Sequence, residues 1–467
     1  MNSDVGVTNA DGENVPNDPM LEQPTNVTRI ARSIAKYDSA GTTQISFYQS
    51  GIGTYDILDK WVGGVTGLGL SEHIREAYQF IAANYDQQTG DEIFLVGFSR
   101  GSFTARSIAA FIDDVGLITP LGMRYFYPIF EDWENQLMPN YKTHFPDFPF
   151  PSPRPNLNDD SGKAEYVSRL QALGFTIPNV KIKAIACYDT VGSLGIPRIG
   201  IFTPDKAPYH SIDYAFVDTT VPKCVQHAIH ALALDEYREP FSPTLWELPV
   251  PAPGQTLTQV WFQGSHADVG GGYDDTRPAD ITLAWMTQQL SAIGLDFDLE
   301  LLKAQYWSAA QEETKPCPWA CGAIHDSMTA QYWLGGVAYR TPDEYLRYNH
   351  STGEPWVPAQ PLVNTRERVH SSVRIRMGLP GPGIGDKGVY SSRALEGWDV
   401  KGVEKGKEID DDHVNLEAIR EGQKSIYWEK DGKQLPEELL GPFEYKLLMT
   451  CLPSVAGKFL TIAPGPR

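Results

Sequence analysis

Residues 91–115 read DEIFLVGFSRGSFTARSIAAFIDDV, and this stretch decides the fold class. It opens with IFLV at 93–96, a short apolar run typical of a buried strand in a parallel sheet. After Ser99 the residues favour a helix, because small and apolar side chains recur at helical spacing. Between strand and helix stands Gly97-Phe98-Ser99-Arg100-Gly101, a GxSxG pattern. A strand, this pattern and a helix in direct succession are the context in which a sharp turn presents a nucleophilic serine.

The same turn has a predicted role in stabilising charge. Ser99 would project its hydroxyl at the N-terminus of the helix, where free N–H groups and the helix dipole favour a developing oxyanion. We expect the backbone N–H of Arg100 to supply half of this oxyanion hole. Gly97 and Gly101 would let strand and helix approach closely, since neither carries a Cβ atom. The alternative interpretation is a glycine-bordered turn without chemistry.

Strands and helices are expected to alternate on both sides of this turn. The predicted strands are QISFYQ (44–49), NVKIKAIACYD (179–189) and TQVWFQG (258–264). The predicted helices are TNVTRIARSIAKYD (25–38), SEHIREAYQFIAANYD (71–86), PKCVQHAIHALALDE (222–236) and PADITLAWMTQQLSAIG (278–294). This alternation predicts an α/β fold, with a mostly parallel sheet and helices on both of its faces.

The pattern divides the chain into three parts. Residues 1–24, rich in Asn, Asp, Pro and Gly, are expected to form a flexible tail. We expect the catalytic domain to span 25–375, with cap-like insertions at about 120–175 and 300–365. The alternation fades after about residue 300, where Trp- and Pro-rich segments suit a cap more than further sheet. Residues 376–467 would form a C-terminal extension that contains a charged loop and packs on the domain through a last helix, PEELLGPFEYKLLMTCL.

A nucleophilic serine needs a base, and the base needs an orienting carboxylate. In a fold of the α/β-hydrolase type these partners follow the serine along the chain as acid, then histidine, at the carboxyl ends of strands. Asp189 ends the strand KIKAIACYD, and His266 directly follows QVWFQGS. Order and placement both fit, so we predict that Ser99, Asp189 and His266 form a catalytic triad.

Other residues compete for these roles. His370 is the rival base, because it also lies downstream of the predicted acid, although in an arginine-rich segment. Asp268 and Asp218 are weaker candidates for the acid, and Asp268 would have to orient an imidazole almost adjacent to it in sequence. His227 and His230 fall inside a predicted helix, where core packing or surface exposure is expected.

Glycine-rich turns and closely spaced cysteines can bind ligands, and this chain contains both. Gly270 and Gly271, after the predicted base, indicate a tight turn or a close approach of substrate to the backbone, supported by Asp268. The glycine-rich stretch 63–69 lacks the Lys-Ser/Thr ending of a nucleotide-binding loop. The CPWAC motif at 317–321 lacks the second ligand pair of a zinc site. We therefore expect no metal and no cofactor.

Composition limits the classes of partner. The chain has 467 residues, a formal net charge of −20 and a pI near 4.9. This acidity argues against nucleic acid, because phosphate binding needs a cationic surface. No 18-residue apolar run and no signal-peptide core occur, so we expect no stable membrane anchor. Five scattered cysteines do not form a disulfide scaffold, which favours a cytoplasmic enzyme.

With these residues the sequence resembles the domain of unknown function 2235 family, in particular its fungal-type members. This is the α/β-hydrolase group that includes the phospholipase effectors of bacterial type VI secretion. The resemblance reaches from about residue 25 to 375, and its motifs include TNVTRIAR, YQSGIGT, GFSRGSFTAR, CYDTVGSLGIP, HALALDEYREPF and VWFQGSHADVGGGY. It implies an α/β-hydrolase fold, Ser99, Asp189 and His266 as the triad, and a lipid ester as substrate.

The sequence departs from this family at its N-terminus. Members of the family begin with a strand followed by Asp-Gly-Thr-Trp, and here Met1 stands where the next loop starts. The resemblance therefore implies that the first strand is missing, together with one candidate oxyanion donor. We expect residues 1–24 to be poorly ordered near the Ser99 side of the sheet, beside an unfilled strand position.

The combined prediction is a serine-dependent carboxylic ester hydrolase, lipase- or phospholipase-like, that acts on a small-molecule or lipid ester. Two alternatives stay open. One is a non-catalytic binding protein on a hydrolase scaffold, because fold alone does not define activity. The other is a thioesterase or peptidase, since a triad does not discriminate by leaving group. The sequence indicates no particular protein partner.

Overall fold

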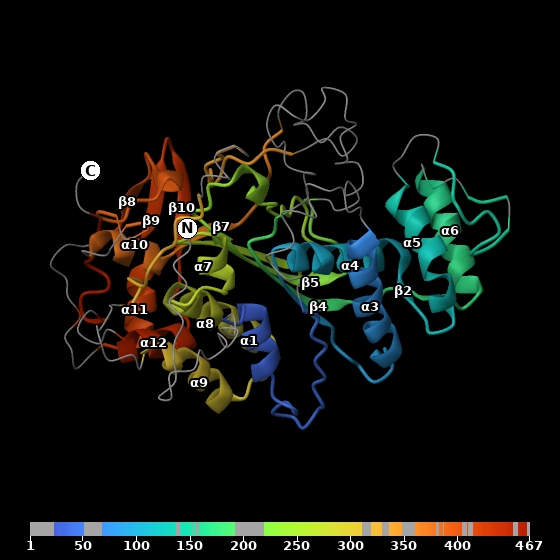
Figure 1. The fold of residues 1–467 in the computed structure, drawn as a ribbon, viewed down its shortest axis with the longest axis horizontal. Coiled ribbons are helices and arrows are strands. Elements are labelled where there is room, and N and C mark those ends of the chain that lie inside the picture. Colours follow the sequence, from blue (N-terminus) through green and yellow to red (C-terminus); the bar gives the residue numbers. More distant parts are fainter. Residues whose placement is uncertain are drawn as a thin grey trace, which may run out of the picture.

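The computed structural model describes residues 23–50, 68–136, 141–151, 153–155, 157, 159–191, 219–310, 319–328, 336–347, 360–379, 383–385, 387–403, 409, 414–451 and 456–464. In this part of the chain an eight-stranded sheet crosses the molecule in the order β1-β4-β5-β6-β7-β10-β9-β8 (Figure 1). Neighbours from β1 to β10 pair in parallel, and β9 and β8 add two antiparallel pairings. The strand bounds are β1 Phe94–Phe98, β4 Ile182–Tyr188, β5 Val225–Ala233, β6 Thr256–Phe262, β7 Glu367–His370, β8 Asp399–Lys401, β9 Tyr427–Lys430 and β10 Lys433–Glu438.

Helices cover both faces of this sheet, as predicted. Strand β4 shows why, because its side chains alternate between two cores. Ile185 and Cys187 pack with α3, α4 and α5, whereas Ala184, Ala186 and Tyr188 pack with α1, α8, α9 and α12. The helix bounds are α1 Asn26–Ser33, α3 Leu68–Asn84, α4 Arg100–Val115, α5 Phe126–Glu134, α6 Asp160–Ala172, α7 His266–Gly270, α8 Arg277–Ser291, α9 Leu299–Ala310, α10 Ser371–Gly378, α11 Leu416–Gln423 and α12 Pro442–Cys451.

The helix predicted over 222–236 is wrong, because this segment forms the central strand β5. It pairs in parallel with β4 on one side and β6 on the other. A strand buried on both faces is apolar throughout, and its residues then match helical spacing by accident. Consequently His230 lies inside the sheet rather than on a helix.

The strand predicted over 44–49 is also wrong. Residues 44–50 have no regular secondary structure, and Ile45, Phe47 and Tyr48 are largely exposed. Phe47 does stack on Phe80 of α3, at 5.0 Å between ring centroids. Alternating apolar residues form a strand only where one face is buried and a partner strand is present, and the described structure supplies neither here.

The expectation that the sheet ends before residue 300 is incorrect as well. Strands β7, β10, β9 and β8 all come from beyond that point and extend the sheet from β6. A separate core under them contains Trp261, Trp398 and Trp428. The last predicted helix begins later than expected, since its first residues belong to β10 and α12 starts at Pro442.

The stretch around residues 120–175 forms a lobe, with α5 and α6 beside α3 and α4 at the end of the molecule far from β8 (Figure 1). The short strands β2 (Leu117–Ile118) and β3 (Thr176–Ile177) close it by antiparallel pairing. Residues 1–22 of the predicted tail 1–24 and residues 63–67 of the glycine-rich stretch 63–69 lie outside the described part, and residues 68–69 begin α3. In the described part of the sheet, β1 is an edge strand.

Candidate active site

Ser99 occupies a sharp turn between the end of β1 and the start of α4. Its backbone has φ 57° and ψ −121°, a left-handed conformation that side-chain-bearing residues rarely adopt. The turn is held by a hydrogen bond of 3.0 Å from the Ser99 N–H to the Tyr188 carbonyl of the neighbouring strand. The sharp strand-to-helix turn predicted at Ser99 is therefore present.

The two glycines of the GxSxG pattern do different jobs. A Cβ atom on Gly97 would lie 2.4 Å from the Gly101 carbonyl oxygen, so strand and helix approach as closely as only glycine allows. A Cβ atom on Gly101 would meet nothing within 4 Å. The prediction that both glycines serve the close approach is thus wrong for Gly101, where an added Cβ atom would meet open space.

This difference yields a stability test within one motif. Gly97→Ala should lower the free energy of unfolding by about 3 kcal/mol, because the added methyl group meets rigid backbone. Gly101→Ala should leave it unchanged or raise it by about 0.5–1 kcal/mol, because alanine favours a helix interior. Denaturant unfolding of both variants measures these changes. Equal stability of the two variants would contradict the close contact between Gly97 and the Gly101 carbonyl.

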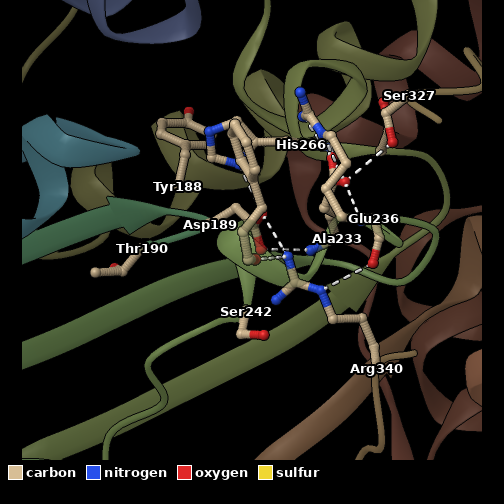
Figure 2. Close-up of polar contacts among 12 residues, drawn as sticks. Tyr188, Asp189, Thr190, Ala233, Glu236, Ser242, His266, Ser327 and Arg340 are labelled. Carbon is tan, nitrogen blue, oxygen red and sulfur yellow. Dashed lines mark hydrogen bonds and ion pairs between the residues drawn. The ribbon is translucent and has the colours of Figure 1, made fainter. Parts of the chain in front are cut away.

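Asp189 follows β4 and is fully buried. Its Oδ1 accepts the Ala233 N–H at 3.1 Å, and its Oδ2 accepts from His266 Nδ1 at 2.7 Å and from an Arg340 terminal nitrogen at 3.0 Å (Figure 2). Burial alone would raise the pKa of Asp189, but the Arg340 charge and the His266 hydrogen bond outweigh it and lower the pKa to about 2. Asp189 is therefore an anion at any physiological pH.

His266 follows β6 as the first residue of α7 and is nearly buried. Its ring lies between two aromatic rings, with centroids 4.5 Å from Phe98 and 5.1 Å from Phe241. Because Phe98 directly precedes Ser99, this contact brings the imidazole to the GxSxG turn. In the described structure His266 forms a hydrogen bond with Asp189 and none with Ser99.

Asp268 is not placed to orient His266. Its carboxylate accepts the Ser265 N–H at 2.8 Å and the Ser265 hydroxyl at 2.9 Å, which caps α7. The other oxygen lies 2.8 Å from His325 Nδ1, and Tyr273 stacks on that ring. Asp268 thus fixes the start of the helix that presents His266. The competing acid Asp218 lies outside the described residues.

His370 is buried with both ring nitrogens occupied. Nε2 lies 2.6 Å from Glu444 Oε1 and Nδ1 lies 2.7 Å from the Ser372 hydroxyl. Its ring stacks on Phe262 of β6. Neither nitrogen contacts Asp189 or Ser99. His370 therefore joins β7 to α12 rather than meeting the predicted acid.

Gly270 and Gly271 let other elements pack against α7. A Cβ atom on Gly270 would lie 2.1 Å from the Phe98 ring, and one on Gly271 would lie 2.9 Å from the Asn26 backbone nitrogen. The Asn26 amide in turn donates to the Val269 carbonyl at 3.1 Å. Both glycines therefore allow other parts of the protein to pack closely against the helix that begins with His266. The groups that approach their backbone are Phe98 and Asn26.

Around Asp189 and His266, Glu236 and Arg340 were not predicted from the sequence, and His230 was expected only to pack in the core or lie at the surface. The Glu236 carboxylate accepts the His266 backbone N–H at 3.3 Å and the Ser327 hydroxyl at 3.0 Å (Figure 2). His230 Nε2 accepts the Thr190 N–H at 3.1 Å, directly after Asp189. Burial, followed by the charge of Arg106, lowers the pKa of His230 to about 3, so its ring is neutral. The charged residues DEYRE at 235–239, directly after an apolar run, could have pointed to Glu236 as a site residue. No feature of the sequence around Arg340 points to the site.

The described residues contain no group of three or more His, Cys, Asp or Glu side chains arranged to hold a metal ion. Cys321, from the CPWAC motif, is a buried thiol in the described part, and Cys317 lies outside it. Every helix in the described ranges is too short or too polar to cross a bilayer.

A serine at a strained strand-to-helix turn, beside a buried carboxylate–imidazole pair on a mostly parallel sheet, is an arrangement of α/β-hydrolases. The chain belongs to the family of Tle1-like catalytic domains of type VI secretion phospholipase effectors, whose family model matches residues 7–289. The description of this family points to a hydrolase of lipase or phospholipase type, in agreement with the resemblance seen in the sequence.

A curated relative is the uncharacterized protein YEL023C of Saccharomyces cerevisiae. It is 28% identical to this chain over 235 residues. The match covers 46% of this chain and 29% of the yeast protein, so the chain spans well under two thirds of that relative's length. The relative carries no assigned activity in its name and adds none to this chain.

Proposed function

We propose that this protein is a serine-dependent carboxylic ester hydrolase of phospholipase type. Ser99 is the nucleophile, His266 the general base and Asp189 the residue that orients and charge-balances the imidazole. The observation that carries the proposal is the 2.7 Å hydrogen bond between Asp189 and His266, set in contact with Phe98 beside the Ser99 turn. Membership of a phospholipase-type family supports the same reaction class.

The proposed reaction has two steps. Ser99 Oγ attacks the ester carbonyl carbon while His266 Nε2 takes its proton, because Nδ1 is held by Asp189. The tetrahedral intermediate collapses when the imidazolium returns that proton to the leaving alcohol. A water molecule then attacks the acyl-enzyme with the same histidine as base, which releases the acid and restores Ser99.

The negative charge of each tetrahedral intermediate needs donors that are already in place. Arg100 is the first residue of α4, so its N–H lies in the first helical turn, where such groups have no intrahelical acceptor. We assign it half of the oxyanion hole.

The proposed substrate is a lipid ester, in line with the family. Purified protein should release fatty acid from phospholipid vesicles and hydrolyse p-nitrophenyl esters, while Ser99→Ala does neither. Acyl-thioesters and peptides run in parallel test the other leaving groups. Hydrolysis of thioesters or peptides alone would replace the ester assignment, and inactivity on every substrate by folded protein would favour a binding role. The expectations of no cofactor, no nucleic-acid partner and a cytoplasmic location stay predictions.

A further inference from the structure

Arg340 lies against the acid of the proposed triad and is buried, with 2% of its surface exposed. It belongs to the described segment 336–347, which pairs with the chain around Arg238 through the Arg238–Val337 bridge and the Ala338 N–H to Tyr237 carbonyl bond. Arg340 also lies beyond residues 7–289, the part of the chain that the family model matches.

We propose that Arg340 is a positioning residue that holds the Asp189–His266 pair in place and places a fixed positive charge beside it. This inference rests on the proposed function, because it assigns Arg340 a role through the proposed base and acid rather than through contact with substrate.

The hydrogen bonds of Arg340 go to three residues that each contact His266, and those to Asp189 and Glu236 can be followed in Figure 2. One terminal nitrogen donates to Asp189 Oδ2 at 3.0 Å and to the Phe241 carbonyl at 2.8 Å. Nε donates to the Glu236 carbonyl at 3.3 Å. The Phe241 ring packs edge-on against the imidazole, and the Glu236 carboxylate accepts the His266 backbone N–H. One rigid guanidinium therefore braces the acid, the aromatic neighbour and the backbone contact of the base.

Charge gives Arg340 its second effect. Asp189 Oδ2 accepts from both Arg340 and His266, so the guanidinium is a fixed positive charge close to a ring that becomes positive during the reaction. Like charges at this range oppose protonation of the imidazole. Replacing Arg340 by a neutral residue should therefore change the pH dependence of activity.

Other ionisable groups also lie near the Asp189–His266 pair, and the Arg340 variants keep all of these side chains. Glu236 and Arg238 form a salt bridge beside the His266 backbone, and His230 lies behind Asp189 as a neutral ring. Asp268, paired with His325, caps the helix of His266. The charge of Arg106 acts on His230, and Tyr345 interacts electrostatically with Asp189. A shift of the pH profile in an Arg340 variant therefore reports the Arg340 charge.

The test is the pH profile of kcat/KM for a soluble ester with Arg340→Gln and Arg340→Lys. Glutamine removes the charge, so the acid limb should move to higher pH by about one unit, and kcat should fall roughly tenfold to a hundredfold as the pair loses its brace. Lysine keeps a positive charge but cannot make all the hydrogen bonds of arginine. The acid limb of Arg340→Lys should therefore also move to higher pH, but by less than that of Arg340→Gln. Arg347→Gln is the matched control, since Arg347 lies in the same segment but pairs with Glu247. Its acid limb should stay in place.

The outcomes separate this inference from the proposed function. An unmoved acid limb in both Arg340 variants, with Ser99→Ala inactive, would overturn the role of Arg340 alone. Full activity of Ser99→Ala would instead overturn the proposed function. Thermal melting of each variant shows whether it folds. If Arg340→Gln does not fold, the pH profile of Arg340→Lys is the test. An acid limb at the wild-type position in that variant would contradict the inference.

Discussion

We expect Ser99→Ala to lower kcat for ester hydrolysis by about 10⁴-fold or more, because without the proposed nucleophile no acyl-enzyme forms and only binding and oxyanion contacts are left. The fold should survive, since alanine fits the space of serine and keeps the turn. Initial rates with a p-nitrophenyl ester, compared with a melting curve of the same preparation, measure both effects.

Ser102→Ala is the matched control for this variant. Ser102 lies three residues further along α4, and its buried hydroxyl donates to the Tyr188 carbonyl at 3.1 Å. Its loss should reduce stability by about 1 kcal/mol and change kcat less than tenfold. A Ser99→Ala enzyme with activity near that of Ser102→Ala would exclude Ser99 as nucleophile.

His266→Ala should reduce kcat about as strongly as Ser99→Ala. The double variant should fall no further, since members of one catalytic unit do not contribute additively. His370→Ala should behave in the opposite way. It removes the donor that faces one oxygen of the buried Glu444 carboxylate, and should lower the free energy of unfolding by about 3 kcal/mol, with kcat changed little.

Side-by-side kinetics and denaturant unfolding of the two histidine variants measure this contrast. If His370→Ala folds and loses activity to the level of Ser99→Ala, while His266→Ala keeps most of its rate, the base is His370. The Asp189–His266 contact would then have to be structural.

Local signals predicted much of this arrangement. Ser99 stands in a strand–glycine–helix sequence whose strain depends only on its neighbours. Asp189 and His266 each come just after an apolar strand, and a parallel sheet brings such positions to one edge. These inferences needed no knowledge of which strands are adjacent.

Long-range packing accounts for what sequence reasoning missed. The β5 segment was mistaken for a helix because its two buried faces leave no alternation. Arg340 contacts Asp189 across 151 positions of sequence from a segment without regular structure, so no spacing rule could join them. The free space at Gly101 likewise depends on the local direction of α4, which the motif alone does not define.

The central claim is that His266 and Asp189 activate Ser99. Its most direct measurement is labelling with a fluorophosphonate, which reacts with an activated serine, followed by mass spectrometry of the digested protein. We expect one adduct, on the peptide that contains Ser99, formed slowly in His266→Ala and not at all in Ser99→Ala. An adduct on another serine, or no adduct on folded wild-type protein, would contradict the claim.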